Sequence, residues 1–148
     1  MKPFVLLISL FLVGLALTLV TPGLTLKLCG KTALSVMLVF TAIGHFRFTR
    51  GMSMMLPEKV PGRKGIVRAT GLIEILASIG LLTPSASRVT GMLLIIFFIL
   101  VLPSNIYAAI NRVNYEKGDF SGKGLPYLWF RIPFQVLLVA WTYVFVLR

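Results

Sequence analysis

The chain has 148 residues, of which 57% are hydrophobic and 13% charged, and its mean hydropathy is +0.94. Soluble domains carry charge on about a quarter of their residues, so this composition excludes an ordinary soluble domain. The net charge of +11 also occurs in nucleic-acid-binding proteins. Here, however, the Lys and Arg residues lie between hydrophobic runs, where they set membrane topology and face anionic headgroups. We therefore predict an integral membrane protein whose partner is the lipid bilayer and not nucleic acid.

Five hydrophobic segments predict an all-α transmembrane helical bundle that forms a single domain over residues 1–148. A spanning helix needs about 20 apolar residues, and the expected helices cover residues 3–21, 32–48, 66–82, 89–110 and 126–147. Polar loops with turn-forming residues separate them, at 49–65 and 111–124. The first segment also has the charge pattern of a signal peptide. It lacks a small-x-small cleavage site before Pro22, which favours a retained helix.

The distribution of Lys and Arg predicts a cytoplasmic N-terminus and an external C-terminus in a plasma or inner membrane. With this orientation, the cytoplasmic segments contain Lys2, Arg47, Arg50, Lys59, Arg63, Lys64, Arg68, Arg112, Lys117 and Lys123. The external segments contain only Lys27, Lys31, Arg88 and Arg148. We expect Trp129 and Trp141 at the inner and outer membrane interfaces. A single cysteine, Cys29, excludes an internal disulfide and is expected to be an inert packing residue.

Polar residues inside the predicted helices identify the candidate site, because such groups are costly within a membrane and require a partner or a role. On the predicted topology they lie about 7–14 Å from the cytoplasmic surface, at 1.5 Å of helical rise per residue. Four helices thus place polar groups in one layer. We treat these residues as candidates for ligand binding or proton relay: His45, Glu74, Asn105, Arg131 and Gln135.

Glu74 and Arg131 are predicted to form a buried ion pair, because each charge alone costs about 2.5–3.5 kcal/mol at the bilayer centre. Pro103 and Pro133 interrupt helical hydrogen bonding beside the layer, which indicates a polar cavity that opens toward the cytoplasm. The alternative is that these side chains only hold helices together or reach the interface. The sequence contains no metal-ligand cluster, nucleophile triad or glycine-rich phosphate loop.

Short motifs in a characteristic order resemble the DoxX-like family of small membrane proteins, over about residues 40–145. They are Gly44-His45-Phe46, Met55-Leu56-Pro57, Val60-Pro61, Gly71-Leu72-Ile73-Glu74, Gly80-Leu81-Leu82-Thr83-Pro84, Leu102-Pro103-Ser104-Asn105-Ile106-Tyr107-Ala108 and Arg131-Ile132-Pro133-Phe134-Gln135. The resemblance implies a four-helix core, to which the first helix is an addition. It also implies redox chemistry, since members include a membrane subunit of a thiosulfate:quinone oxidoreductase.

Three functions follow as hypotheses. The first is a membrane subunit or accessory of a quinone-linked redox system, in which Glu74 exchanges a proton, Arg131 stabilises its carboxylate and His45 assists. Its cofactor would be a quinone, and its partners membrane or soluble redox proteins. The second is binding or transport of a small amphipathic molecule or lipid without chemistry. The third is a structural assembly factor for other membrane proteins. All three leave open whether the chain is an enzyme or a homo-oligomer.

Overall fold

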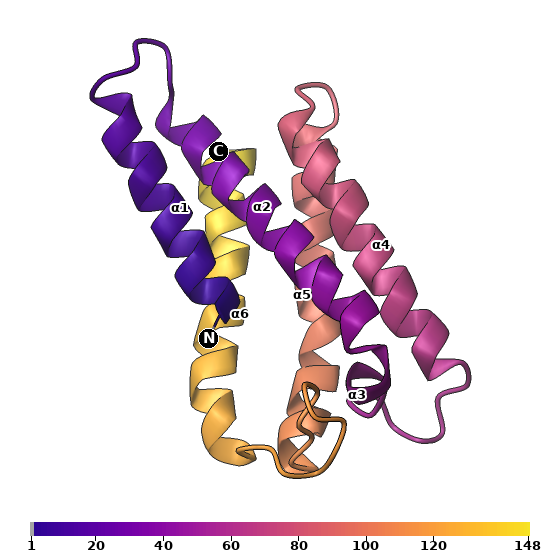
Figure 1. The fold of residues 1–148 in the computed structure, drawn as a ribbon. Helices are drawn as coiled ribbons and strands as arrows, with labels where there is room; N and C mark the ends of the chain where they lie inside the picture. Colours follow the sequence, from indigo (N-terminus) through magenta and orange to yellow (C-terminus); the bar gives the residue numbers. More distant parts are fainter. Residues whose placement is uncertain (1) are drawn as a thin grey trace.

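The computed structural model describes residues 2–148 and is built from helices (Figure 1). Four stretches are long and apolar enough to cross a membrane: Leu26–Arg47, Arg63–Leu82, Ser87–Ile110 and Leu125–Leu147. In chain order the elements are α1 Lys2–Thr18, α2 Leu26–Arg47, α3 Thr49–Ser53, α4 Arg63–Leu82, α5 Ser87–Ile110, the 3₁₀-helix η1 Leu125–Tyr127, α6 Leu128–Thr142 and the π-helix η2 Tyr143–Leu147. The structure confirms the all-α bundle with one additional N-terminal helix.

Local sequence signals explain where the elements begin and end. The Thr25 hydroxyl accepts a hydrogen bond from the Leu28 amide and caps α2. This helix therefore begins six residues before the predicted start at residue 32, and the two lysines of its first turns lie inside it. Gly62, with φ of 67°, precedes α4. The loop predicted at 49–65 contains one short helix, α3. Pro103 and Pro133 lie inside α5 and α6 without ending them.

The N-terminal helix α1 is part of the bundle. It lies beside α2 (Figure 1) and buries Leu7 completely. Its Phe11 ring lies edge-on to the Trp141 ring of α6, with 4.8 Å between the centroids. Trp141 is consequently buried and donates a hydrogen bond to the Gly30 carbonyl at 3.0 Å. Trp141 thus packs within the bundle, whereas Trp129 is 86% exposed; the positions expected for them at the two membrane interfaces stay predictions.

Hydrophobic residues occupy the outward faces of the helices as well as the core. Large apolar side chains are exposed along α4 and α5, including Leu72, Leu76, Ile79, Leu93, Ile96 and Leu100. Exposed apolar surface of this extent is rare on soluble monomers, but it is the expected surface toward lipid. The core between the helices is also apolar and includes Leu34, Leu38, Leu81, Leu94 and Phe98. The chain therefore has the surface and the helices of a membrane protein.

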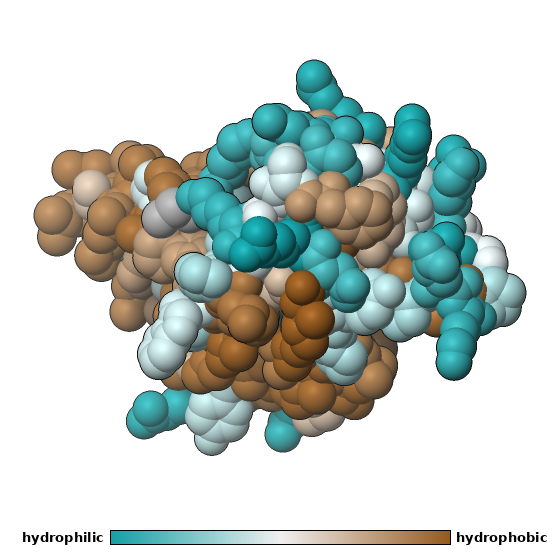
Figure 2. Space-filling model, turned by 90° about the horizontal axis from the view of Figure 1, so that it is seen from below, coloured by the Kyte–Doolittle hydropathy of each residue, from teal (hydrophilic) through white to brown (hydrophobic). Residues whose placement is uncertain are grey.

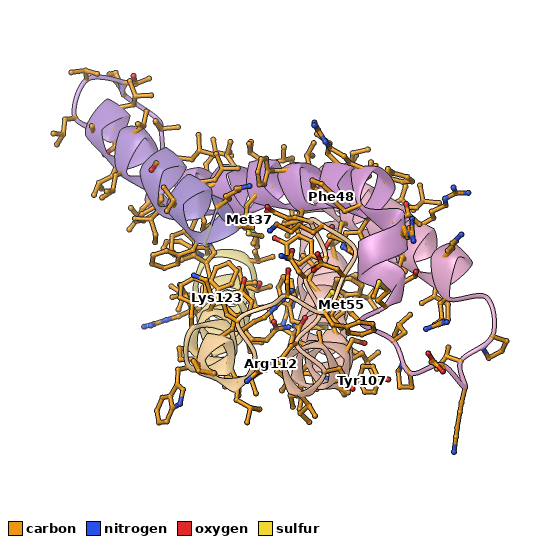
Figure 3. The ribbon with its side chains drawn as sticks, turned by 60° about the horizontal axis from the view of Figure 1, so that its bottom comes forward. Met37, Phe48, Met55, Tyr107, Arg112 and Lys123 are labelled. Carbon is orange, nitrogen blue, oxygen red and sulfur yellow. The ribbon has the colours of Figure 1, made fainter. Side chains whose placement is uncertain are left out.

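One end of the bundle carries most of the cations, and we call it the basic end. Here α2 ends, α4 begins and the loop 111–124 joins α5 to α6 (Figure 1). Figure 2 looks onto this end and shows hydrophilic residues gathered over it. The loop is closed by a bridge between Asn114 and Asp119, and it crosses the end of the bundle between Arg112 and Lys123 (Figure 3). This loop therefore covers the space between α5 and α6 at the basic end.

Candidate functional site

All five polar candidates line one cavity of about 570 Å³ near the basic end, which we call the inner cavity. Its walls come from α2, α4, α5 and α6. Lys2 and Pro3 at the start of α1 and Tyr115 and Glu116 of the loop 111–124 also line it. Apolar side chains make up much of the rest: Met37, Leu38, Phe40, Phe97, Phe98, Phe134 and Leu138. Helices that are distant in sequence thus bring His45, Glu74, Asn105, Arg131 and Gln135 to one space.

His45 is held by α4 through its Nδ1 atom. That nitrogen lies 3.0 Å from the Val67 carbonyl and 3.0 Å from the Thr70 hydroxyl. The Thr70 hydroxyl itself donates to the same Val67 carbonyl at 2.8 Å. Two acceptor oxygens therefore face Nδ1, and we assign the proton to that nitrogen. The other ring nitrogen, Nε2, is left to face Glu74.

Glu74 pairs with His45. Its Oε1 lies 3.6 Å from His45 Nε2, which is within ion-pair range but longer than a hydrogen bond. Because Nδ1 already carries a proton, the facing Nε2 and carboxylate attract each other only when one further proton lies on either of them. Their separation is therefore short enough for attraction once that proton is present.

The predicted ion pair between Glu74 and Arg131 was wrong. Among the side chains of residues 2–148, Arg131 makes no ion pair within 4 Å. Its guanidinium lies over the Tyr127 ring, 5.5 Å from the centroid, in a cation–π contact. Glu74 instead turns toward α2, because α4 lies directly beside that helix, whereas Arg131 enters the cavity from α6. The half-buried Arg131 is thus left without a carboxylate.

Asn105 and Gln135 form the opposite wall and contact each other. Asn105 Nδ2 donates to Gln135 Oε1 at 3.5 Å, and Gln135 Nε2 donates to the Phe98 carbonyl. Glu74 and Asn105 are only 7% and 3% exposed, yet Glu74 Oε2 and Asn105 Oδ1 are buried without a hydrogen-bond partner. Leaving such a group unpaired costs about 1–3 kcal/mol. Two residues that line the inner cavity therefore each have one acceptor oxygen that is buried and unpaired.

Several residues that complete the site were not predicted as part of it. The hydroxyl of Thr70 and the carbonyl of Val67 orient His45. Lys2 donates to Glu116 at 3.0 Å and ties α1 to the loop 111–124. This hydrogen bond lowers the pKa of Glu116, while burial raises the pKa of the Tyr115 hydroxyl nearby. The sequence could not predict the pairing of Lys2 with Glu116, because the two residues are 114 positions apart.

A comparison with protein families identifies the family of the chain. A family model described as a domain of unknown function (DUF8561) matches residues 34–146. The chain belongs to this family. The DUF8561 match includes all five polar candidates and leaves out α1. No curated protein matches the chain, and no solved structure matches it. These comparisons do not connect DUF8561 to DoxX-like proteins, so that resemblance stays a prediction.

Proposed function

We propose that the chain binds a small amphipathic molecule in the inner cavity. The observation that carries this proposal is the inner cavity itself, which combines apolar walls with Glu74 and Asn105, two residues that each have one buried acceptor oxygen without a partner. Buried polar groups in proteins are nearly always paired, so these atoms call for hydrogen-bond donors. The ligand therefore carries hydroxyl or amine groups at one end and an apolar body that contacts Phe97, Phe98 and Phe134.

The volume and the position of the inner cavity agree with such a ligand. Cavities for small molecules usually have volumes of about 300–1,000 Å³, apolar walls and a few convergent polar groups, and the inner cavity has about 570 Å³. We further propose that the basic end is cytoplasmic, in a plasma or inner membrane, because most Lys and Arg residues lie there. The polar end of the ligand would then lie in the cytoplasmic half of the bilayer.

The test compares Glu74→Gln with Glu58→Gln, in which the same change is made at an exposed loop carboxylate. Each variant is purified in parallel with the wild type, and its small molecules are extracted and quantified by mass spectrometry. Losing a hydrogen bond to a charged group costs about 1.5–3 kcal/mol, so we expect Glu74→Gln to retain at least about tenfold less ligand. Glu58→Gln should match the wild type.

Two outcomes would contradict this proposal. One is a wild-type extract without any enriched small molecule. The other is equal ligand content in both glutamine variants. If the cavity is empty but Glu74→Gln lowers the recovery of other membrane proteins, the assembly role is the better description.

A quinol is a second candidate, favoured by the proximity of His45 Nε2 and the Glu74 carboxylate, which together can take up a proton. A quinol has two hydroxyl groups that can donate hydrogen bonds and an apolar body, which is the class of ligand proposed for the inner cavity. When a redox partner protein takes the two electrons of the quinol, two hydroxyl protons must also leave: Glu74 can accept one and pass it to an unprotonated His45 Nε2, and the other goes to water. The chain would then be an accessory of a quinone-linked redox system, as the DoxX-like resemblance implies. Quinone in the extract, together with slower quinol oxidation in Glu74→Gln membranes, is the expected result; unchanged oxidation would reject this role.

A further inference from the structure

A second cavity of about 430 Å³ lies at the basic end, and we call it the vestibule. It lies between the end of α5, the loop 111–124 and the start of α6, with Ala109, Asn114 and Gly124 among its walls. It shares Asn105, Arg131 and three further lining residues with the inner cavity. The two spaces are therefore neighbours, but the walls of the vestibule are more polar and lie closer to the end of the bundle.

The charges in the vestibule are unbalanced. Three cations line it, Lys2, Lys123 and Arg131, against one carboxylate, Glu116. That carboxylate is already paired with Lys2 at 3.0 Å. Within residues 2–148, neither Arg131 nor Lys123 has a carboxylate within ion-pair distance. A half-buried guanidinium without a counter-ion is unfavourable, so the charges of the vestibule favour an anion.

The start of α6 also favours an anion in the vestibule. Gly124 and Tyr127, at the first turn of η1 and α6, line the vestibule, and no side chain caps either helix start. The N-terminal end of a helix carries partial positive charge, although the Tyr127 and Leu128 amides here already donate to the Gly124 and Leu125 carbonyls. Arg131 lies above the Tyr127 ring, which fixes its position. A guanidinium presents its donors in a planar fork that matches the oxygens of phosphate.

We propose that the vestibule binds a phosphate group, held by Arg131 and Lys123 at the start of α6. This site adjoins the inner cavity and shares Arg131 with it, but it does not rest on the function proposed for that cavity. The phosphate can belong to the headgroup of an anionic phospholipid or to a free phosphate in solution. Both sources offer the same oxygens, so the experiment must distinguish them.

The experiment uses the full chain, delipidated in neutral detergent and examined by native mass spectrometry. Phosphatidylglycerol, phosphatidylcholine and inorganic phosphate are added in separate arms. Wild-type protein should retain phosphatidylglycerol in preference to phosphatidylcholine if a lipid supplies the phosphate. Retention or competition by inorganic phosphate would support a free phosphate as the source. Equal, weak retention in all three arms would overturn the proposal.

Variants test which residues hold the phosphate. We expect Arg131→Gln to bind at least about tenfold less tightly, and Lys123→Gln to lose affinity as well. The controls are Arg68→Gln at the exposed start of α4 and Lys117→Gln, a lysine of the same loop that does not line the vestibule. Equal losses of phosphate affinity in the variants and their controls would mean that only the general surface charge matters, and would refute the site.

A gain-of-binding variant keeps the test valid if Arg131→Gln fails to fold. Glu116→Gln removes the one carboxylate of the vestibule and releases Lys2. We therefore expect tighter phosphate binding by Glu116→Gln than by wild type. Weaker or unchanged binding would contradict the electrostatic argument. Because Glu74→Gln leaves the vestibule intact, it should retain phosphate even when it loses the ligand of the inner cavity.

Discussion

The close contact between α2 and α4 sets the distance between His45 and Glu74, and Gly71→Ala tests this dependence. A Cβ atom at residue 71 would lie 2.8 Å from His45 Cβ and 3.2 Å from the Phe46 ring. Ordinary contact begins near 3.4 Å, so the helices must separate by about 0.6 Å at this point. If the separation adds to the 3.6 Å between His45 Nε2 and Glu74 Oε1, that distance becomes about 4.2 Å and the pair is lost.

The expected energy is a balance of two terms. Overpacking of a buried contact costs about 1–3 kcal/mol, and Gly→Ala inside a helix returns about 0.5–1 kcal/mol. Gly71→Ala should therefore lower the free energy of unfolding by up to about 2 kcal/mol. Gly65→Ala is the matched control, because it lies on the same helix and its new Cβ meets nothing within 4 Å. That control should be neutral or slightly stabilising.

The assay uses the fact that the chain contains a single histidine. In protein labelled with ¹⁵N-histidine, two imidazole nitrogen signals report directly on the protonation of His45. The two His45 nitrogen signals should be the same in wild type and Gly65→Ala and should differ in Gly71→Ala. Thermal unfolding in detergent is measured on the same samples. If Gly71→Ala keeps the wild-type signals and the stability of Gly65→Ala, the inferred dependence of the pair on helix spacing is refuted.

Two further predictions concern the loop 111–124. In Gly51→Ala the new methyl group would overlap the backbone carbonyl of Tyr115, so the loop must shift and its limited proteolysis should accelerate, whereas Gly44→Ala, whose Cβ makes only an ordinary contact, should behave as wild type. The pKa of Glu116 lies below its ordinary value of 4.5 because of Lys2. Its pairing therefore stabilises the loop above that value and is lost as the pH falls through the lowered pKa. Proteolysis should accelerate below about pH 4 in wild type but show no such step in Lys2→Gln.

From the sequence, the level of a polar residue along the bundle was easier to predict than the helix that its side chain faces. Helix ends and the rise per residue placed His45, Glu74 and Asn105 in one layer, and the structure brings them to one cavity. The predicted partner of Glu74 was nevertheless wrong, since hydropathy does not determine which helix a buried side chain faces. That choice depends on the close approach of α2 and α4 at Gly71, which involves residues far apart in the chain. Thr25 is a typical N-cap residue and could have predicted the start of α2, but the helix bounds were predicted from apolar segments alone.

The pairing of Glu74 with histidine rather than arginine changes what the site can do. A buried Glu–Arg pair would stay ionised and hold its geometry, because arginine does not release its proton. The His45–Glu74 pair has zero net charge whether its proton lies on nitrogen or on oxygen, so the proton can move within the pair without placing a net charge in the membrane. Arg131, free of any carboxylate within residues 2–148, then favours an anion on the other side of the cavity. This arrangement would suit the proton exchange proposed above for a bound quinol, and a fixed structural ion pair would not provide it.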